Sequence, residues 1–325
     1  MNIKELKNQF LEYLEIEKNR SPKTIENYSR HLDKFLEITD VGHPEQIDDS
    51  LIRNFRLYLN RFQDEKGQGL KKATQNYYII VLRSFLKYLA KRDIKSLQAE
   101  KVEIGHTPER EVEFLENSEV ERILAAASGS SFKALRDRAI LELLFSAGLR
   151  VSELVSINRE KINFQSGELS VRGKGNKIRV VFISDTAAAS LKKYLEARTD
   201  VDPALFVRDE KGLKQFKKKK ASVETQNVAS LQNTRDKNDL RLTPRSVQRI
   251  VKYYALKAGL VKNVHPHTLR HSFATDLIMN GADIRSVQEM LGHASITTTQ
   301  IYTHITNPHL KEVHQAFHAR RRKTK

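Results

Sequence analysis

Residues 167–184 read GELSVRGKGNKIRVVFIS, and this stretch decides the fold class. Apolar and polar residues alternate in its first part, GKGN turns the chain, and the alternation then resumes, as in two paired strands. The alternating apolar residues are Leu169, Val171, Ile178, Val180 and Phe182. Because the segments on both sides have a helical period, we predict a mainly α protein with a small β-hairpin or sheet, in the α+β class.

Helices flank the predicted hairpin. Apolar residues recur every three or four positions in four segments, which cover residues 117–128, 132–157, 186–198 and 243–260. The last segment starts with Thr243 as the N-cap residue and Pro244 in the first turn. We assign these segments and the hairpin to one domain, at residues 113–325.

Residues 1–102 predict a separate helical domain. Its first helix places one apolar stripe at a spacing of three to four, and Ser21 and Pro22 open the second helix. The stripe consists of Ile3, Leu6, Phe10 and Leu14. Four such helices with short connections indicate a compact helical unit. Residues 103–112 have no helical period and contain Gly105 and Pro108, so we expect a linker there.

The charge of the chain is its strongest bulk property. Lysine and arginine number 57 against 40 aspartates and glutamates, a net charge of +17. Such an excess favours a polyanionic partner, above all nucleic acid, although a generic basic protein stays open. The chain has no cysteine, which excludes disulfides, a thiolate nucleophile and a cysteine zinc site. We expect no membrane contact and a cytoplasmic location.

Residues 209–241 interrupt the second domain. Apolar residues are sparse there, and the segment contains four consecutive lysines, Lys217 to Lys220. This composition is typical of a basic surface insertion. The sequence leaves open whether the insertion contacts phosphates, touches a partner subunit, or is a tolerated surface loop.

Six residues of the second domain form a possible catalytic set, namely Arg150, Lys174, His267, Arg270, His293 and Tyr302. Each alone has an ordinary explanation: a core tyrosine, a solvated lysine or a surface His–Arg pair. Together they have the chemistry of phosphodiester cleavage. Two guanidiniums grip the non-bridging oxygens of a phosphate, a lysine protonates a leaving alkoxide, and histidines move the proton of an attacking phenol. Fixed cations then replace a metal ion.

A metal site is the competing reading of the histidines. His267 and His271 are four residues apart, as two ligands on one helix face would be. However, the chain has no H-E-x-x-H pattern and no cysteine, so we expect neither a metal nor another cofactor.

Four motifs carry a family resemblance. AGLRVSEL, RGKGNKIRVV, HPHTLRHSFATDL and LGHASITTTQIYTH resemble the motifs of the tyrosine recombinases, or phage-integrase family, and are most similar to its Xer branch, which resolves chromosome dimers. The resemblance covers nearly the whole chain. It implies that residues 1–102 form a SAM-like core-binding domain on DNA and that residues 113–325 form the catalytic domain.

The resemblance assigns a role to each member of the catalytic set. Arg150 and Arg270 match the two phosphate-binding arginines, and His293 matches the histidine that contacts the scissile phosphate. Lys174 matches the general acid for the 5′-hydroxyl, and His267 matches the acceptor of the tyrosine proton. The nucleophile is then Tyr302, which forms a 3′-phosphotyrosine link without ATP.

Glu153 matches an acidic residue that the family often keeps near its first arginine. Either it buttresses Arg150, or it is merely a neighbour of the helix N-cap; the sequence does not separate the two.

The expected DNA contacts lie on two helices. Residues 70–92 resemble the family's core-domain helix that enters a DNA groove, and Arg245 and Gln248 open a helix of the catalytic domain. The candidate contacts are Lys71, Lys72, Thr74, Arg83, Arg245 and Gln248. A solvated, charged helix face is the alternative for each of them.

The resemblance predicts a site-specific recombinase that acts on a double-stranded DNA core site as a homo- or hetero-tetramer, with a sister recombinase in the second case. A translocase of the FtsK type is a possible regulator. In the family a C-terminal helix docks on a neighbouring protomer, and here Leu310, Val313 and Phe317 would supply its apolar stripe. Packing of this stripe within the same protomer is the alternative. A mobile-element integrase with the same chemistry and a catalytically inert DNA-binding protein are the alternatives.

Overall fold

The computed structural model describes residues 2–106, 113–173, 178–209 and 240–292. The chain divides into two compact units, Met1–Arg110 and Glu111–Lys325. Each unit has its own hydrophobic core. Lys174, His293, Tyr302, the C-terminal residues 307–319 and most of the predicted insertion lie outside the described residues.

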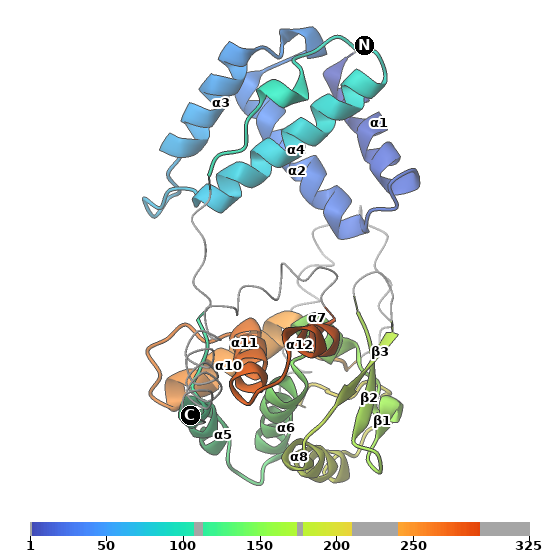
Figure 1. Cartoon of the computed structure of the whole chain (residues 1–325), viewed down its shortest axis with the longest axis vertical. Coiled ribbons are helices and arrows are strands. Elements are labelled where there is room, and N and C mark those ends of the chain that lie inside the picture. Colours follow the sequence, from blue (N-terminus) through green and yellow to red (C-terminus); the bar gives the residue numbers. More distant parts are fainter. Residues whose placement is uncertain (1, 107–112, 174–177, 210–239, 293–325) are drawn as a thin grey trace, which may run out of the picture. The chain divides into compact units, whose positions relative to one another are not determined.

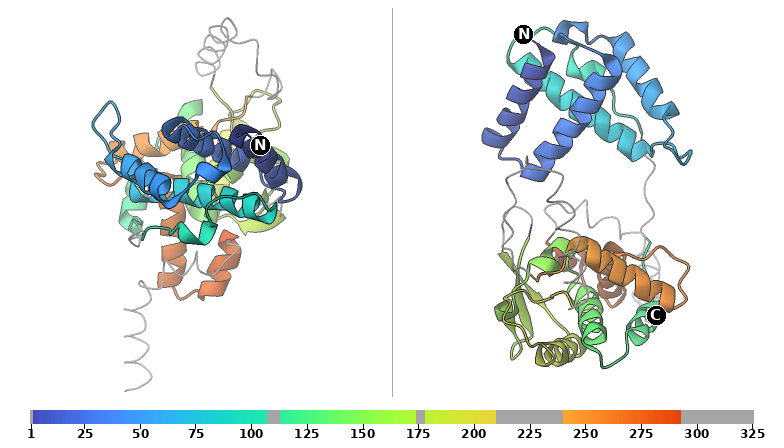
Figure 2. Two further views of the ribbon diagram at one scale, coloured as in Figure 1. Left: turned by 90° about the horizontal axis from the view of Figure 1, so that it is seen from above. Right: turned by 180° about the vertical axis from the view of Figure 1, so that it is seen from behind.

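The first unit is a small helical domain (Figure 1). Its helices are α1 (Ile3–Ile16), α2 (Pro22–Thr39), α3 (Asp49–Arg61) and α4 (Lys72–Lys91), with short 3-10 helices η1 (Pro44–Gln46) and η2 (Ala99–Lys101). Helix α2 packs beside α1 and α4, as the further views in Figure 2 also show. The stripe predicted for the first helix is confirmed, because Ile3, Leu6, Phe10 and Leu14 are its buried residues.

Local signals explain where the helices of this unit begin. The side chain of Ser21 accepts a hydrogen bond from the Thr24 backbone N–H, and Pro22 occupies the first turn of α2. Asp48 caps α3 in the same way through Leu51. The core is rich in aromatic rings, with Phe10 lying 5.4 Å from Phe85 and Phe35 lying 4.9 Å from Phe55 between ring centroids.

The second unit packs helices against a three-stranded sheet. Its helices are α5 (Asn117–Ala126), α6 (Phe132–Ala147), α7 (Val151–Ser156), α8 (Asp185–Glu196), α10 (Pro244–Lys257), α11 (Pro266–Met279) and α12 (Ile284–Leu291), with the 3-10 helix η3 (Arg159–Lys161). In Figure 1 the sheet lies at one side of this unit, and the rear view of Figure 2 brings α10 to the front. Helix α6 is buried around most of its circumference, which makes it the central helix of the core.

The strands β1 (Ile162–Asn163), β2 (Glu168–Arg172) and β3 (Ile178–Phe182) form an antiparallel sheet in the order β1-β2-β3. The predicted hairpin is therefore present, with Leu169 opposite Val181 and Val171 opposite Arg179. The outer strand β3 exposes its most apolar residues and buries Val181 beside the half-buried Arg179. The exposed residues are Ile178, Val180 and Phe182.

The fold class predicted from the sequence, mainly α with a small sheet, is confirmed. Among the described residues no helix is both long enough and apolar enough to cross a bilayer.

Candidate functional site

Arg150 is held where α6 ends and α7 begins. Helix α6 stops at Gly148, whose left-handed backbone (φ +56°) suits glycine. A side chain there would collide with Phe273, because an ideal Cβ would lie 2.4 Å from its ring. The turn brings Arg150 to the N-cap of α7, with about a quarter of its side chain exposed.

Glu153 accepts two hydrogen bonds from Arg150. Its Oε2 accepts the backbone N–H of Arg150, and its Oε1 accepts the guanidinium Nη1, each at 2.8 Å. The first bond is a helix cap and the second is an ion pair, so Glu153 caps the helix and also buttresses Arg150. Glu153 is only 3% exposed. Burial acts to raise its pKa, but the hydrogen bonds from Arg179 and Arg150 outweigh it and lower the pKa to about 2.

Arg270 reaches the same place from α11. It is buried, its Nη2 donates to the carbonyl oxygen of Leu291 at 2.7 Å, and its Nη1 donates to the carbonyl oxygen of Gly148. Nη1 also lies 4.0 Å from Glu153 Oε2. Arg150 Nη2 donates to the next carbonyl, that of Gly292, at 3.1 Å. The two arginines therefore cap the C-terminal ends of α6 and α12, whose last carbonyls lack helical partners.

His267 lies one turn before Arg270 on α11 and is exposed. The ring of His265, which caps this helix, lies 6.2 Å away between centroids. Desolvation lowers the pKa of His267, and the positive charges of Arg270, His265 and Arg150 lower it further, while Glu153 opposes them. The lowered pKa favours the neutral form of the imidazole, which has a nitrogen that can accept a proton.

Arg179 completes this cluster, and the sequence analysis missed it. Its Nη1 and Nη2 donate to Oε1 and Oε2 of Glu153, both at 2.8 Å. The pair joins β3 to α7, and the two residues are 26 positions apart. The alternation of the hairpin gave no signal for this arginine, because it placed Ile178, Val180 and Phe182 on the inward face and Arg179 on the opposite one. Three guanidiniums and one carboxylate give the cluster a net charge of +2, which suits an anion with the geometry of a phosphate.

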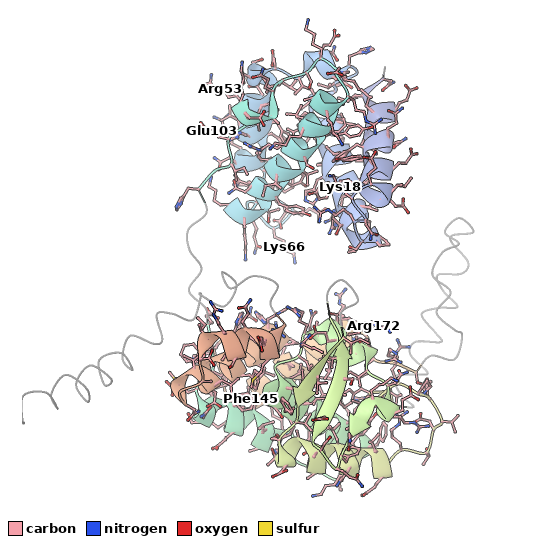
Figure 3. All side chains as sticks on the ribbon, turned by 45° about the vertical axis from the view of Figure 1, so that its right-hand side comes forward. Lys18, Arg53, Lys66, Glu103, Phe145 and Arg172 are labelled. Atoms are coloured by element: carbon pink, nitrogen blue, oxygen red, sulfur yellow. The ribbon has the colours of Figure 1, made fainter. Side chains whose placement is uncertain are left out.

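Two further members of the catalytic set directly follow described residues in the sequence. Lys174 follows Gly173 after the end of β2, where Figure 3 shows Arg172, and His293 follows Gly292. Lys174, His293 and Tyr302 lie outside the described residues, so their roles stay predictions. No cluster of three or more metal-ligating side chains occurs in the part of the chain that the structure describes.

Candidate DNA contacts in the first unit lie at the start and in the middle of α4. Lys71 and Lys72 are exposed at the start of α4, and Lys72 Nζ donates to Asn60 of α3 at 2.7 Å. Thr74 is half-buried. Arg83 is also half-buried, and its guanidinium donates to the backbone carbonyl of Val102, which ties α4 to the following segment. Figure 3 shows Lys66 in the connection between α3 and α4, beside this lysine pair in sequence.

Candidate contacts in the second unit lie at the start of α10. Thr243 caps this helix through the Ser246 N–H, and Arg245 and Gln248 are exposed in its first turns. Their position makes them accessible, while a role in DNA contact stays a prediction for all six residues.

A largely apolar pocket of about 730 Å³ lies between α5, α6, β3, α11 and α12. Its apolar lining includes Phe145, which Figure 3 labels on α6, and the exposed strand residues Val180 and Phe182. Leu277 and Met290 line it from the other side. The exposed apolar residues Val180 and Phe182 of β3 thus form part of a concave surface.

The insertion leaves the second unit through a paired stem. The Arg208 N–H donates to the Leu240 carbonyl at 2.9 Å, and the Leu242 N–H donates to the Phe206 carbonyl at 3.0 Å. Arg241 fixes this stem to the end of α7 through the Val155 carbonyl at 2.7 Å. The described residues on either side of residues 210–239 are therefore neighbours.

Comparison with known proteins gives two family matches. The profile described as "Phage integrase family" matches residues 113–309, and the one described as "Phage integrase, N-terminal SAM-like domain" matches residues 8–93. The chain is 36% identical over 310 residues to a tyrosine recombinase XerC of Thermodesulfovibrio yellowstonii, covering 95% of this chain and 94% of that protein. It is 36% identical over 322 residues to a tyrosine recombinase XerD of Listeria innocua, covering 98% and 100%.

Solved structures share the fold at low identity. A XerH site-specific recombinase bound to a palindromic difH substrate matches with a TM-score of 0.67 and 23% identity, over 95% of this chain and 84% of that chain. A lambda integrase tetramer bound to a Holliday junction matches with a TM-score of 0.64 and 18% identity, over 91% and 79%. The family matches and the near full-length identity agree, so the chain belongs to the phage integrase family of tyrosine recombinases, which are DNA strand-transferring site-specific enzymes.

Proposed function

We propose that this protein cuts and rejoins a specific DNA core site through Tyr302 and resolves chromosome dimers at a dif-like site. One observation carries the proposal most directly. Arg150 and Arg270, 120 positions apart in sequence, bind the consecutive carbonyls of Gly292 and Leu291 and approach the same carboxylate, Glu153. A pair of guanidiniums fixed in this way is suited to hold one phosphodiester.

The proposed reaction is a transesterification. The phenol oxygen of Tyr302 attacks the scissile phosphorus, the bond from phosphorus to the 5′-oxygen breaks, and a 3′-phosphotyrosine forms. His267 accepts the phenol proton and Lys174 gives a proton to the departing 5′-oxygen. Arg150 and Arg270 stabilise the charge on the non-bridging oxygens, and His293 donates to one of them. The reverse reaction with a new 5′-hydroxyl reseals the DNA.

The chemistry needs neither ATP nor a metal ion in this proposal. The phosphotyrosine link keeps the energy of the broken ester, so religation requires no energy source. The +2 cluster of arginines and Glu153 supplies the electrostatic stabilisation that a metal ion supplies in other phosphoryl-transfer enzymes.

DNA binding is assigned to both units. Lys71, Lys72, Thr74 and Arg83 of α4 and Arg245 and Gln248 of α10 are the proposed contacts. The net charge of +17 supports a large phosphate contribution, so affinity should fall steeply as salt rises.

Assembly on DNA follows from the same family resemblance. We assign the pocket between α6 and β3 to the C-terminal segment of a neighbouring protomer, whose Leu310, Val313 and Phe317 would enter it. Such exchange would build a tetramer, either of this chain alone or with a sister recombinase, in the cytoplasm. An FtsK-type translocase is a further proposed partner.

The test is recombination in a plasmid that carries two directly repeated dif-like sites. Wild-type protein, with or without a sister recombinase, should excise the intervening DNA, and Arg150→Ala should not. Recombination that occurs only between sites from a mobile element would show that the protein is a mobile-element integrase and does not resolve chromosome dimers. Binding to the sites without any strand exchange, with every candidate sister present, would contradict the proposed activity.

A further inference from the structure

Arg179 is assigned no contact of its own with the reacting groups and enters the proposed reaction only through the charge of the cluster, yet it has the most regular ion pair there. Both of its terminal nitrogens donate to Glu153, one to each carboxylate oxygen, at 2.8 Å. Its side chain is 15% exposed, and Nε is buried with no acceptor among the described residues. Within those residues, the polar interactions of this arginine are therefore directed to Glu153 alone.

The same side chain packs beneath the helix end that holds Arg150. An ideal Cβ on Gly292 would lie 3.0 Å from Arg179 Cδ and 3.1 Å from both Nε and Nη1. The carbonyl of Gly292 accepts Arg150 Nη2, and Arg179 itself pairs with Glu153, which accepts Arg150 Nη1. Both groups that hold the Arg150 guanidinium, the Gly292 carbonyl and the Glu153 carboxylate, are thus next to Arg179.

Charge explains why a second arginine is needed there. A buried carboxylate paired only with Arg150 would cancel most of the charge that Arg150 offers to a phosphate. It would also attract Arg270, whose Nη1 already lies 4.0 Å away. With Arg179 bound in a fork, the carboxylate is neutralised from the side of the sheet and keeps only its geometric role toward Arg150.

We infer that Arg179 is a positioning residue, which neutralises Glu153 so that this carboxylate orients Arg150 without cancelling the positive charge presented to the scissile phosphate. This inference rests on the proposed function and deepens it. Arg179 also belongs to β3, which pairs with β2, so its ion pair with Glu153 joins the hairpin to the arginine cluster.

The test compares Arg179→Met with the double variant Glu153→Gln/Arg179→Met, in the full-length protein. Single-turnover cleavage is measured on a nicked core site with either an ordinary scissile phosphate or a methylphosphonate, which lacks one negative charge. We expect Arg179→Met to slow cleavage of the phosphate by roughly 10- to 100-fold, less than the loss of a direct donor. DNA affinity should stay within about threefold.

Two further results separate charge from mere structure. The double variant, which has no unpaired buried carboxylate, should regain about tenfold of the lost rate. On the methylphosphonate, the ratio of the wild-type rate to the Arg179→Met rate should be about tenfold smaller than on the phosphate, because this substrate has less negative charge to stabilise in the transition state. Arg198→Gln is the matched control, because Arg198 donates two hydrogen bonds to the carboxylate of Asp200 in the same unit. This variant should have a lower melting temperature, but the ratio of its cleavage rates on the two substrates should equal that of wild type.

A folded Arg179→Met that cleaves within about threefold of wild type would overturn the inference. Equal losses on both substrates with no recovery in the double variant would also overturn it and leave a structural role only. If Arg179→Met does not fold, Arg179→Lys and the double variant carry the same comparison. If wild type cleaves neither substrate on any site and with any sister recombinase tested, the proposed function fails. Thermal shifts with inorganic phosphate then decide the inference: stabilisation that is lost in Arg179→Met and restored in the double variant supports it, and equal shifts overturn it.

Discussion

Arg270 donates from Nη2 to the carbonyl oxygen of Leu291, 2.7 Å away, and this bond fixes α11 to the last turn of α12. The motif LGH has a physical explanation in this contact. Leu291 and Gly292 provide consecutive carbonyls to Arg270 and Arg150, and the residue that follows them is His293. A helix end, with its unpaired carbonyls and negative dipole, thereby orients two cations.

Gly148→Ala should disrupt this arrangement. Its added Cβ would lie 2.4 Å from the ring of Phe273, at a residue with positive φ. We expect a loss of about 2–4 kcal/mol in the free energy of unfolding, from strain and overpacking together, and a larger loss in cleavage because the Gly148 carbonyl holds Arg270. Calorimetry and single-turnover cleavage measure the two effects.

Gly281→Ala is the control for that experiment. Gly281 also has a positive φ, but a Cβ there would meet nothing within 4 Å. It should cost only about 1 kcal/mol and leave cleavage unchanged. Equal effects of the two substitutions would mean that the contact with Phe273 is irrelevant to the site.

Much of the fold was predictable because its signals are local. The stripe of α1, the Ser21–Pro22 start of α2 and the Thr243–Pro244 start of α10 each depend on residues within one or two turns. The hairpin was predictable from the period of two and the turn GKGN, and its register places Leu169 against Val181.

The rest depends on tertiary contacts that no local pattern contains. The pairing of Arg179 with Glu153 spans 26 positions and exists only because the fold brings the side chain of a β3 residue to one of α7. The alternation in β3 predicted the strand but not its orientation, and the apolar Val180 faces a pocket instead of the core. Arg83, expected as a DNA contact, donates to the Val102 carbonyl, a partner that its sequence context does not indicate.

His271 should make the second unit sensitive to acid. Burial and the nearby charges of His267, Arg270 and His265 lower its pKa from 6.5 to about 4. The unfolded chain therefore binds the proton first, and stability is complete above pH 6.5 and is lost as the pH falls toward 4, by roughly 3 kcal/mol at most. Calorimetry across this range should show the loss in wild type and a flatter profile in His271→Gln; parallel profiles would refute the assignment.

The insertion should be removable. Because residues 206–208 pair with 240–242, an Asn–Gly turn in place of residues 210–239 would connect ends that are already adjacent. We expect an unchanged or slightly raised melting temperature, since a long loop is shortened. If the lysine run contacts phosphates, the slope of log affinity against log salt should also flatten by about 0.9 per lost contact. An unchanged slope would mean that the insertion makes no phosphate contacts. A variant that does not fold would contradict the pairing of residues 206–208 with 240–242.

Val180→Asp should weaken assembly on DNA. The carboxylate would enter the apolar pocket assigned to the neighbour's C-terminal segment, so occupancy of paired sites should drop by about tenfold or more while binding to a single half-site persists. Native gels with one-site and two-site DNA distinguish these effects. Ser170→Asp is the matched control, because Ser170 lies opposite Val180 in the sheet but does not line the pocket. A two-site defect of equal size in both variants would exclude the pocket as the docking site.

The nucleophile is the central claim, and a suicide substrate tests it most directly. A dif-like core site with a nick beside the scissile phosphate traps the covalent product, because the short 5′-hydroxyl fragment diffuses away. Wild-type protein, without metal ions or ATP, should form an adduct with DNA that resists denaturant, and Tyr302→Phe should bind the same DNA and form none. An adduct that persists in Tyr302→Phe would contradict the account, as would the absence of any wild-type adduct on every site and with every sister recombinase tested.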